Sequence, residues 1–490
     1  MTARRLLPVL LLLPGTLAAQ GYRLRLDARA QSVAYRGVTP DSVPASEVTT
    51  GPDGGPVSSE GYGVRCTGGP HCYFYRPGPS LQAVPLWTSA SLVVWGLGVT
   101  GLSAHATARL VTNAGDEDAW PGMEPTAQLL EGYLNYDRGV LRARAGRLLI
   151  PSRLQQVGLD GAWARVRWAD VDLDFSGYGG WGLAQAAVLP VTSEALNPLD
   201  EWRPDDRQIV LGAEAVWSPS PADVRLEYRR ETDPATGEYV SERAALSGTA
   251  RLSRQLRATG GAEWNIAEGY VGSADLGVTW VDTRFTVTAG GRRYRPFFSL
   301  WTLWGVFSPV PYNAVHGSAQ VTAASWLTLR ARGERYWYEN SGAASPRVIL
   351  EDRGWRASGG ATVTPSRRVQ IDAGLLGEFG PGASSRSVDA TVTYTASDAL
   401  SVAVYGGGLE RPLELRYYDA SAAWLGTRGE WRPSGLWRLW GDATWFTEER
   451  ERPDPGGSTL DQVRLRAGVA VTFGTNADRL PLPPARRSTP

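Results

Sequence analysis

Arginines recur two residues apart in this chain, a spacing that could present a row of positive charge to small ions. Arg142 and Arg144 have this spacing, and so do Arg464 and Arg466. A row of cationic side chains favours anions, whereas a ladder of salt bridges with nearby acids is the alternative. The charged residues that we expect to share one face are Arg142, Arg144, Arg165, Arg167, Arg330, Arg332, Glu334, Asp372, Asp389, Arg464 and Arg466.

Residues for catalysis are sparse. A catalytic site needs a nucleophile, or a histidine and a carboxylate within hydrogen-bond range. His105 lies near Ser103, and His316 near Ser318, but the spacing assigns neither histidine an acidic partner. We therefore do not expect an enzyme, and we expect no cofactor, because no phosphate-binding loop or metal-ligand cluster is present.

Cys66 and Cys72 are the two cysteines of the chain, in the segment VRCTGGPHCYF. With no other thiol to compete, they are expected to form a disulfide in an exported protein. His71 leaves a metal site as an alternative interpretation, which lacks a fourth ligand.

The elements that position these side chains have the period of β-strands. In VRLRAGVAVTF, residues 463–473, apolar side chains take every second place and arginines lie between them. Residues 22–30, 209–217 and 388–394 alternate in the same way. Such a pattern predicts strands with one apolar and one polar face. A soluble sheet packed on a core is the alternative for any single strand.

The first residues indicate export. Arg4 and Arg5 precede an apolar run that ends in Ala18 and Ala19, which predicts a signal peptide over residues 1–19. No later apolar run approaches about 18 residues, so no membrane-spanning helix is expected. The net charge is zero, and all 50 basic residues are arginine. Zero net charge argues against nucleic-acid binding.

Connections of two lengths alternate along the chain. Short ones lie at 137–139, 218–223, 281–283, 365–368 and 432–435, and long ones at 36–80, 113–125, 179–206, 295–312, 339–352 and 450–459. Short turns on one rim and long loops on the other are typical of bacterial outer-membrane barrels. We predict an all-β fold, a single antiparallel up-and-down barrel of about 22 strands (roughly 18 to 26), with short periplasmic turns and long extracellular loops.

The predicted barrel covers residues 20–474, and a periplasmic tail follows at 475–490. Closure should pair the first and last strands, residues 22–30 and 463–473, because open strand edges in hydrocarbon leave backbone groups unpaired. The apolar face would then contact lipid, and the arginine face would line a wet interior.

Aromatic residues support this interpretation. Tyr270 and Trp280 are ten residues apart, which spans roughly 23 Å in a tilted strand, close to the apolar band of about 25 Å between aromatic girdles. Ordinary strand aromatics are the alternative. The predicted girdle residues are Trp217, Tyr270, Trp280, Trp326, Trp431 and Trp437.

The chain resembles outer-membrane porins of Gram-negative type. The segment LLEGYLNYDRGVLRARAGRLLIPSRLQQVGLDGAW, residues 129–163, is similar to a strand, hairpin and strand pattern of substrate-selective porins. Its Glu131, Tyr133 and Leu134, together with GLDGA at 158–162, carry the resemblance. The resemblance implies a location in the bacterial outer membrane and a channel function.

Three segments could narrow the interior by folding inward: 36–80, 179–206 and 295–312. The third holds aromatic residues that would form a constriction or docking loop, or alternatively extend the neighbouring strands: Phe297, Phe298, Trp301, Trp304 and Phe307.

We expect a channel for passive or facilitated diffusion of small polar solutes. The alternative is a sleeve that holds a partner protein, such as a periplasmic multihaem cytochrome in a porin–cytochrome electron conduit. No CxxCH motif occurs, so any haem would belong to that partner. Arg23, Arg25, Arg464 and Arg466 would meet at the closing strands, which hints at a preference for anions.

Overall fold

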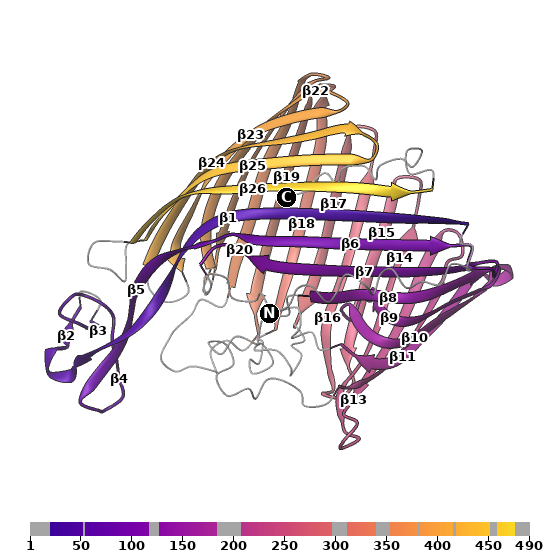
Figure 1. The fold of residues 1–490 in the computed structure, drawn as a ribbon, viewed down its shortest axis with the longest axis horizontal. Coiled ribbons are helices and arrows are strands. Elements are labelled where there is room, and N and C mark those ends of the chain that lie inside the picture. Colours follow the sequence, from indigo (N-terminus) through magenta and orange to yellow (C-terminus); the bar gives the residue numbers. More distant parts are fainter. Residues whose placement is uncertain are drawn as a thin grey trace.

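The structure, a computed structural model, describes residues 20–51, 54–116, 127–183, 207–295, 311–339, 353–380, 383–414, 418–450 and 458–475. Within these residues the chain forms a closed antiparallel barrel of 22 strands, in which each strand pairs with its neighbours in sequence (Figure 1). The predicted all-β, up-and-down barrel of about 22 strands is therefore confirmed. No helix of the described residues is long and apolar enough to cross a membrane.

The wall strands are β1 (Gly21–Pro44), β6 (Pro85–Trp95), β7 (Leu102–Asn113), β8 (Ala127–Arg138), β9 (Leu141–Ile150), β10 (Val157–Trp168), β11 (Leu173–Gly182), β12 (Ile209–Trp217), β13 (Ala222–Thr232), β14 (Tyr239–Arg251), β15 (Leu256–Asn265), β16 (Tyr270–Val281), β17 (Phe285–Tyr294), β18 (Tyr312–Ala324), β19 (Leu327–Tyr338), β20 (Arg353–Ser366), β21 (Val369–Phe379), β22 (Ala383–Ser397), β23 (Leu400–Glu414), β24 (Tyr418–Ser434), β25 (Trp437–Arg450) and β26 (Ser458–Gly474).

The barrel closes where β1 pairs with β26. Leu24 lies opposite Phe473, and Ser32 lies opposite Leu465. On its other side β1 pairs with β6. The predicted pairing of residues 22–30 with residues 463–473 is confirmed, and it leaves no open edge along this part of the wall.

The two faces of the sheet have opposite chemistry. Apolar side chains of one face are exposed, for example Leu276 at 65% and Val463 at 58%. Charged side chains lie on the other face, and some of them are buried, with Glu227 4% exposed and Arg229 2% exposed. A soluble protein has the reverse distribution. The arrangement is that of a barrel whose outer surface is apolar and whose interior is polar.

The connections of one rim are short, as predicted, whereas the opposite rim has short connections as well as long ones. The rim near Trp217 has short turns, such as 139–140, 282–284 and 435–436. On the opposite rim, the connections 151–156, 233–238 and 266–269 are also short. Most of each long loop predicted at 113–125, 179–206, 295–312, 339–352 and 450–459 lies outside the described residues.

The predicted long connection 36–80 is present between the wall strands β1 and β6, but much of it is strand. β1 continues past the wall and pairs with β5 (His71–Ala83), from Val33 opposite Ala83 to Pro44 opposite His71. As far as Arg36 the register is the same as in the β1–β6 pair, where Ala30 lies opposite Leu86, so β5 and β6 follow one another along β1. The register then shifts by one residue between Arg36 and Val38. We call residues 33–83 the ribbon; it projects from one end of the barrel (Figure 1).

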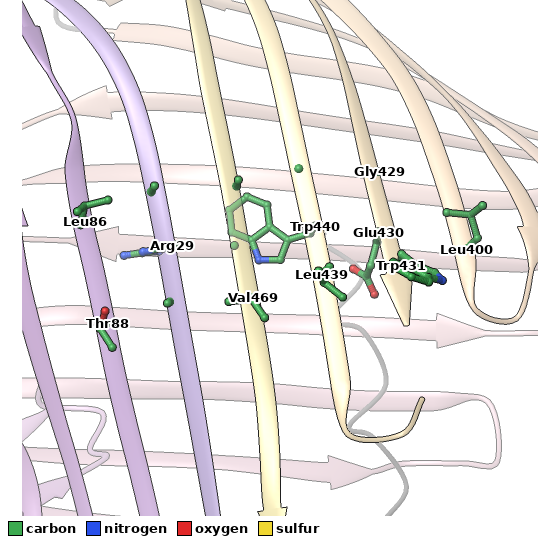
Figure 2. A pocket seen from close by; sticks show the side chains of 15 residues that line it. Arg29, Leu86, Thr88, Leu400, Gly429, Glu430, Trp431, Leu439, Trp440 and Val469 are labelled. Carbon is green, nitrogen blue, oxygen red and sulfur yellow. The ribbon is translucent and has the colours of Figure 1, made fainter. Parts of the chain in front are cut away.

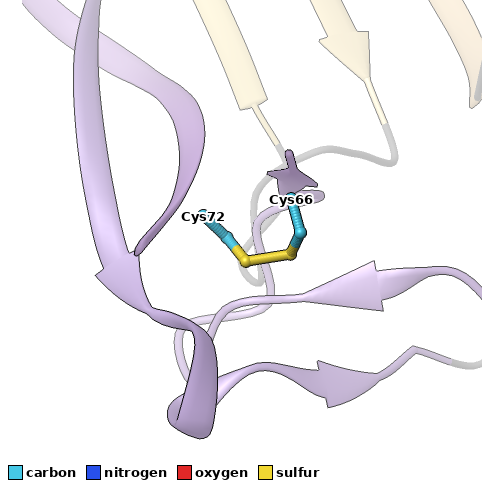
Figure 3. The surroundings of a disulfide bond; sticks show 2 residues. All are labelled: Cys66 and Cys72. Atoms are coloured by element: carbon cyan, nitrogen blue, oxygen red, sulfur yellow. A yellow bond between two sulfur atoms is a disulfide. The ribbon is translucent and has the colours of Figure 1, made fainter. Parts of the chain in front are cut away.

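The tip of the ribbon has its own small core. It contains η3 (Ala45–Glu47), β2 (Thr49–Thr50), β3 (Pro56–Val57) and β4 (Arg65–Cys66). Val43, Val64 and Phe74 are buried there together with Cys72. Cys66 and Cys72 lie opposite each other on β4 and β5 and form a disulfide, as predicted (Figure 3).

Candidate functional site

Four of the predicted arginines come together on the inner face of β9 and β10. Arg142 lies directly opposite Arg165. Arg144 lies between two aromatic rings, with its guanidinium carbon 5.4 Å from the centre of Tyr133 and 5.1 Å from that of Trp163. We call Arg142, Arg144, Arg165 and Arg167 the arginine wall.

Carboxylates pair with only two of the four arginines in the arginine wall. Arg142 Nε lies 3.2 Å from Asp137 Oδ2, and Arg167 Nε lies 4.0 Å from Asp174 Oδ1. Among the described residues, neither Arg144 nor Arg165 has a carboxylate within ion-pair distance. The arginine wall therefore carries excess positive charge in the barrel interior.

A short connection between β9 and β10 folds onto the inner face of distant strands. Its residues 151–156, which we call the latch, follow directly after Ile150. The Ser152 hydroxyl and the Arg153 backbone N–H both donate hydrogen bonds to Glu227 on β13. Arg229 Nη1 on the same strand donates to the carbonyl of Gln155 at 3.2 Å. The latch therefore crosses the inner face from β9 to β13.

The Arg153 side chain of the latch also contacts two further strands. Its Nε lies 3.4 Å from Glu263 Oε1 on β15, and its Nη2 donates to Asp275 on β16. The side chain lies flat on Gly261, where a Cβ atom would stand 2.6 Å from Arg153 Nη1. Only glycine leaves room for the guanidinium at this position.

Apolar packing fixes the base of the latch. Leu154 is fully buried. Leu148, Ile150, Val157 and Leu159, on the two strands that enter and leave the latch, form a buried cluster with Val210. Burial of a leucine side chain contributes about 1.5–3 kcal/mol. The latch is therefore an ordered part of the interior, and it lies close to the arginine wall on the same two strands.

The latch was not predicted from the sequence. The three segments expected to fold inward are longer, and PSRLQQ resembles an ordinary connection. The partners of Ser152 and Arg153 are 75 and 122 residues away. No local pattern in the sequence indicates such contacts.

A second group of predicted residues lies on β19, β21 and β22, apart from the arginine wall. Glu334 is 5% exposed and accepts hydrogen bonds from Arg292 and Arg356 at 2.8 and 3.0 Å. Arg332 Nη2 lies 3.8 Å from Glu334 Oε2. Arg330 Nη2 lies 3.9 Å from Asp372 Oδ1. This group is a network of ion pairs.

Asp389 completes this second group from β22. It lies directly opposite Gly374 of β21, the strand that also holds Asp372. A Cβ atom at Gly374 would stand 3.1 Å from Asp389 Oδ1, so the missing side chain makes room for the carboxylate.

The remaining predicted arginines lie on or near the seam, where β1 pairs with β26 and closes the barrel. Arg466 Nη2 donates to Asp442 Oδ1 at 2.8 Å, and Tyr405 donates to the same carboxylate. Arg25 Nε pairs with Asp27 Oδ2 at 2.8 Å. Arg464 lies over the ring of Phe446, 4.2 Å from its centre. The register places Arg23 opposite Gly474 and Arg25 opposite Thr472, whereas Arg466 lies opposite Gln31. The four arginines therefore do not meet, and the prediction of a basic ladder at this seam was wrong.

The aromatic residues proposed for a girdle lie at strand ends. Their exposed fractions are 50% for Trp217, 40% for Trp280, 51% for Trp326, 50% for Trp431 and 43% for Trp437. All five are close to the short turns of one rim.

The sixth proposed girdle residue, Tyr270, lies at the opposite end of β16, under Arg295, whose guanidinium carbon is 3.6 Å from the ring centre. Exposed tryptophans also lie towards that opposite rim: Trp181, Trp264, Trp337, Trp355 and Trp445.

A shallow groove of about 720 Å³ runs over β1 and β24–β26 (Figure 2). Ala30, Ala467, Gly441 and Gly429 face it in one row, and Leu86 and Trp431 are among its larger residues. Ala467 shares the face of Leu465, which is 50% exposed. The groove therefore belongs to the apolar outer surface, apart from the interior site.

The predicted constriction residues Phe297, Phe298, Trp301, Trp304 and Phe307 lie outside the described residues. So do the predicted signal peptide and nearly all of the predicted tail.

No protein-family model matches this sequence, and no curated protein is detectably similar to it. Among solved structures, the chain is similar to the siderophore receptor PirA from Pseudomonas aeruginosa, with a TM-score of 0.50 and 11% identity over 92% of this chain and 80% of that one. OccAB2 from Acinetobacter baumannii gives a TM-score of 0.41 and 9% identity, over 93% and 98% of the two chains. OpdK from Pseudomonas aeruginosa, solved with vanillate, gives 0.39 and 10%, over 93% and 99%. The likeness to PirA shows a shared barrel fold.

Proposed function

We propose that the protein is a bacterial outer-membrane channel through which small polar solutes diffuse. The observation that supports this most strongly is the inversion of the two faces in a closed barrel, apolar outside and charged inside. An apolar outer surface is stable only against lipid, and a barrel of this strand number is wide enough to hold an aqueous path. The exposed tryptophans at both ends suit the two membrane interfaces.

The arginine wall and the latch suggest how this channel selects solutes. The latch crosses part of the interior and narrows the path beside β9 and β10. A solute that passes the latch meets Arg144 and Arg165, which have no described carboxylate within ion-pair distance. Positive charge on a pore wall attracts anions and repels cations. We therefore propose a preference for small anions.

The latch also bears on the sleeve hypothesis. A protein packed against the wall at β13–β16 would have to displace Arg153 and Ser152 from their carboxylate partners. Among these carboxylates Glu227 is buried, and leaving it without its donors costs several kcal/mol. No contact among the described residues favours a partner protein or a multihaem cytochrome, so we do not propose this role.

The test is conductance in planar lipid bilayers. The purified protein should open steady channels, and in a salt gradient the reversal potential should indicate anion preference. The double substitution Arg144→Gln and Arg165→Gln should lower the anion-to-cation permeability ratio severalfold. The matched control neutralises two exposed rim arginines, Arg138→Gln and Arg284→Gln, and should leave the ratio unchanged.

Two results would contradict the proposal. Absence of conductance from folded protein would exclude a channel. An equal shift of the reversal potential in both double variants would show that the arginine wall has no special role. Fractionation of cells on a sucrose gradient tests the location, since the protein should sediment with outer membranes.

A further inference from the structure

Four tyrosines form a cluster on the inner face of β17–β19, near the rim opposite the short turns. Tyr294 lies directly opposite Tyr312, and Tyr312 lies directly opposite Tyr338. The ring centres of these pairs are 5.6 and 5.7 Å apart. Tyr336 lies below this row, 6.1 Å from Tyr312 and 5.9 Å from Tyr338. We call these residues the tyrosine cluster.

The base of the tyrosine cluster is tightly packed. Tyr336 is 1% exposed, and its ring lies over Gly354 and Gly380, where a Cβ atom would stand 2.3 and 2.0 Å from Tyr336 atoms. Its hydroxyl donates to Glu378 Oε1 at 3.4 Å. Tyr294, in contrast, is 42% exposed. The cluster therefore presents aromatic surface to the interior from a rigid base.

The charges next to the cluster are already engaged in ion pairs with one another. Arg356 Nε donates to Glu378 at 2.7 Å, and Glu334 accepts from both Arg292 and Arg356. The guanidinium of Arg292 also lies 5.5 Å from the centre of the Tyr312 ring. An ion would gain little from this balanced network. A neutral solute with many hydroxyl groups would find both donors and acceptors there.

We propose that the tyrosine cluster binds neutral saccharides that enter the channel. This inference rests on the proposed channel function and assigns a second class of solute to a wall remote from the arginine wall. The C–H faces of a pyranose ring stack on exposed aromatic rings, and its hydroxyls hydrogen-bond to guanidinium and carboxylate groups. Aromatic surface combined with a few fixed polar groups is the usual composition of a small-molecule site.

The experiment measures interruption of the channel current by maltotriose, a neutral sugar, in planar bilayers. Maltotriose should interrupt the wild-type current in a saturable manner. In the double variant Tyr294→Ala and Tyr338→Ala, the half-blocking concentration should rise about tenfold. Replacing the same residues by phenylalanine keeps the rings and should change that concentration less than about threefold. Trp87→Ala, an inner-face aromatic on β6, serves as the control and should have no effect.

The outcomes separate the two proposals. If the protein conducts and maltotriose never interrupts the current, the saccharide site is refuted and the channel stands. If the protein does not conduct, the channel itself is refuted. Equal block of wild type and the alanine variant, with equal open conductance, would also overturn the assignment to the tyrosine cluster.

Discussion

Replacing Arg153 by alanine should release the latch. Arg153 is 25% exposed in its ion pairs with Glu263 and Asp275, whose side chains are 25% and 45% exposed. A hydrogen bond to a charged group contributes about 1.5–3 kcal/mol. Loss of both contacts should weaken the closed position by about 3 kcal/mol after allowance for the exposure of Asp275. That difference raises the ratio of open to closed latch about 100-fold.

Single-channel recording measures this change. In the Arg153→Ala variant the current should fluctuate to a larger conductance that is rare in the wild type. Arg284→Ala is the matched control, because it removes an exposed arginine from the turn 282–284, on the rim opposite the latch. Gly261→Ala should resemble Arg153→Ala, since its Cβ would crowd the guanidinium. If Arg153→Ala and wild type give the same conductance and current noise, the latch does not limit the path.

Three further predictions concern stability. Leu276→Arg, in the middle of the outer face, should lower the unfolding free energy in lipid by about 2–4 kcal/mol. Leu252→Arg, in a rim turn, is the control and should leave this free energy unchanged. Equal urea midpoints for the two variants would contradict the assignment of Leu276 to the lipid-facing surface. Glu334→Ala should cost about 1.5–3 kcal/mol, because it removes the carboxylate that Arg292 and Arg356 share, while Arg356 keeps Glu378. An unchanged midpoint would show that the network contributes nothing. The double variant Cys66→Ser and Cys72→Ser should leave barrel unfolding unchanged but speed protease cleavage within residues 33–83, and cleavage at the wild-type rate would refute a stapling role.

The alternation of apolar and polar residues along each strand was predictable, because one face of the sheet contacts lipid and the other contacts water. Between lipid and water, every second side chain must be apolar, so VRLRAGVAVTF reveals both the strand and its faces. The pairing of residues 22–30 with 463–473 then followed from the need to close the edge.

The ribbon and the latch could not be found in this way. In the ribbon, Pro40 and Pro77 interrupt the alternation, and both faces meet the same solvent beyond the wall, so no period of two is required. The latch depends on Glu227 and Asp275, whose nearness to Arg153 arises only when the barrel closes. Strand alternation places the four arginines of the arginine wall on one face, but it carries no information on which of them have a carboxylate partner.

The seam between β1 and β26 has a consequence for biogenesis. The Tyr22 backbone N–H donates to the Thr475 hydroxyl at 3.3 Å, across 453 residues of chain. Contacts this distant in sequence carry a large entropic cost and form slowly. Until the last strand has been delivered, both end strands expose unpaired backbone that readily recruits other chains. Assembly of this protein therefore requires a factor that shields the two end strands until they meet.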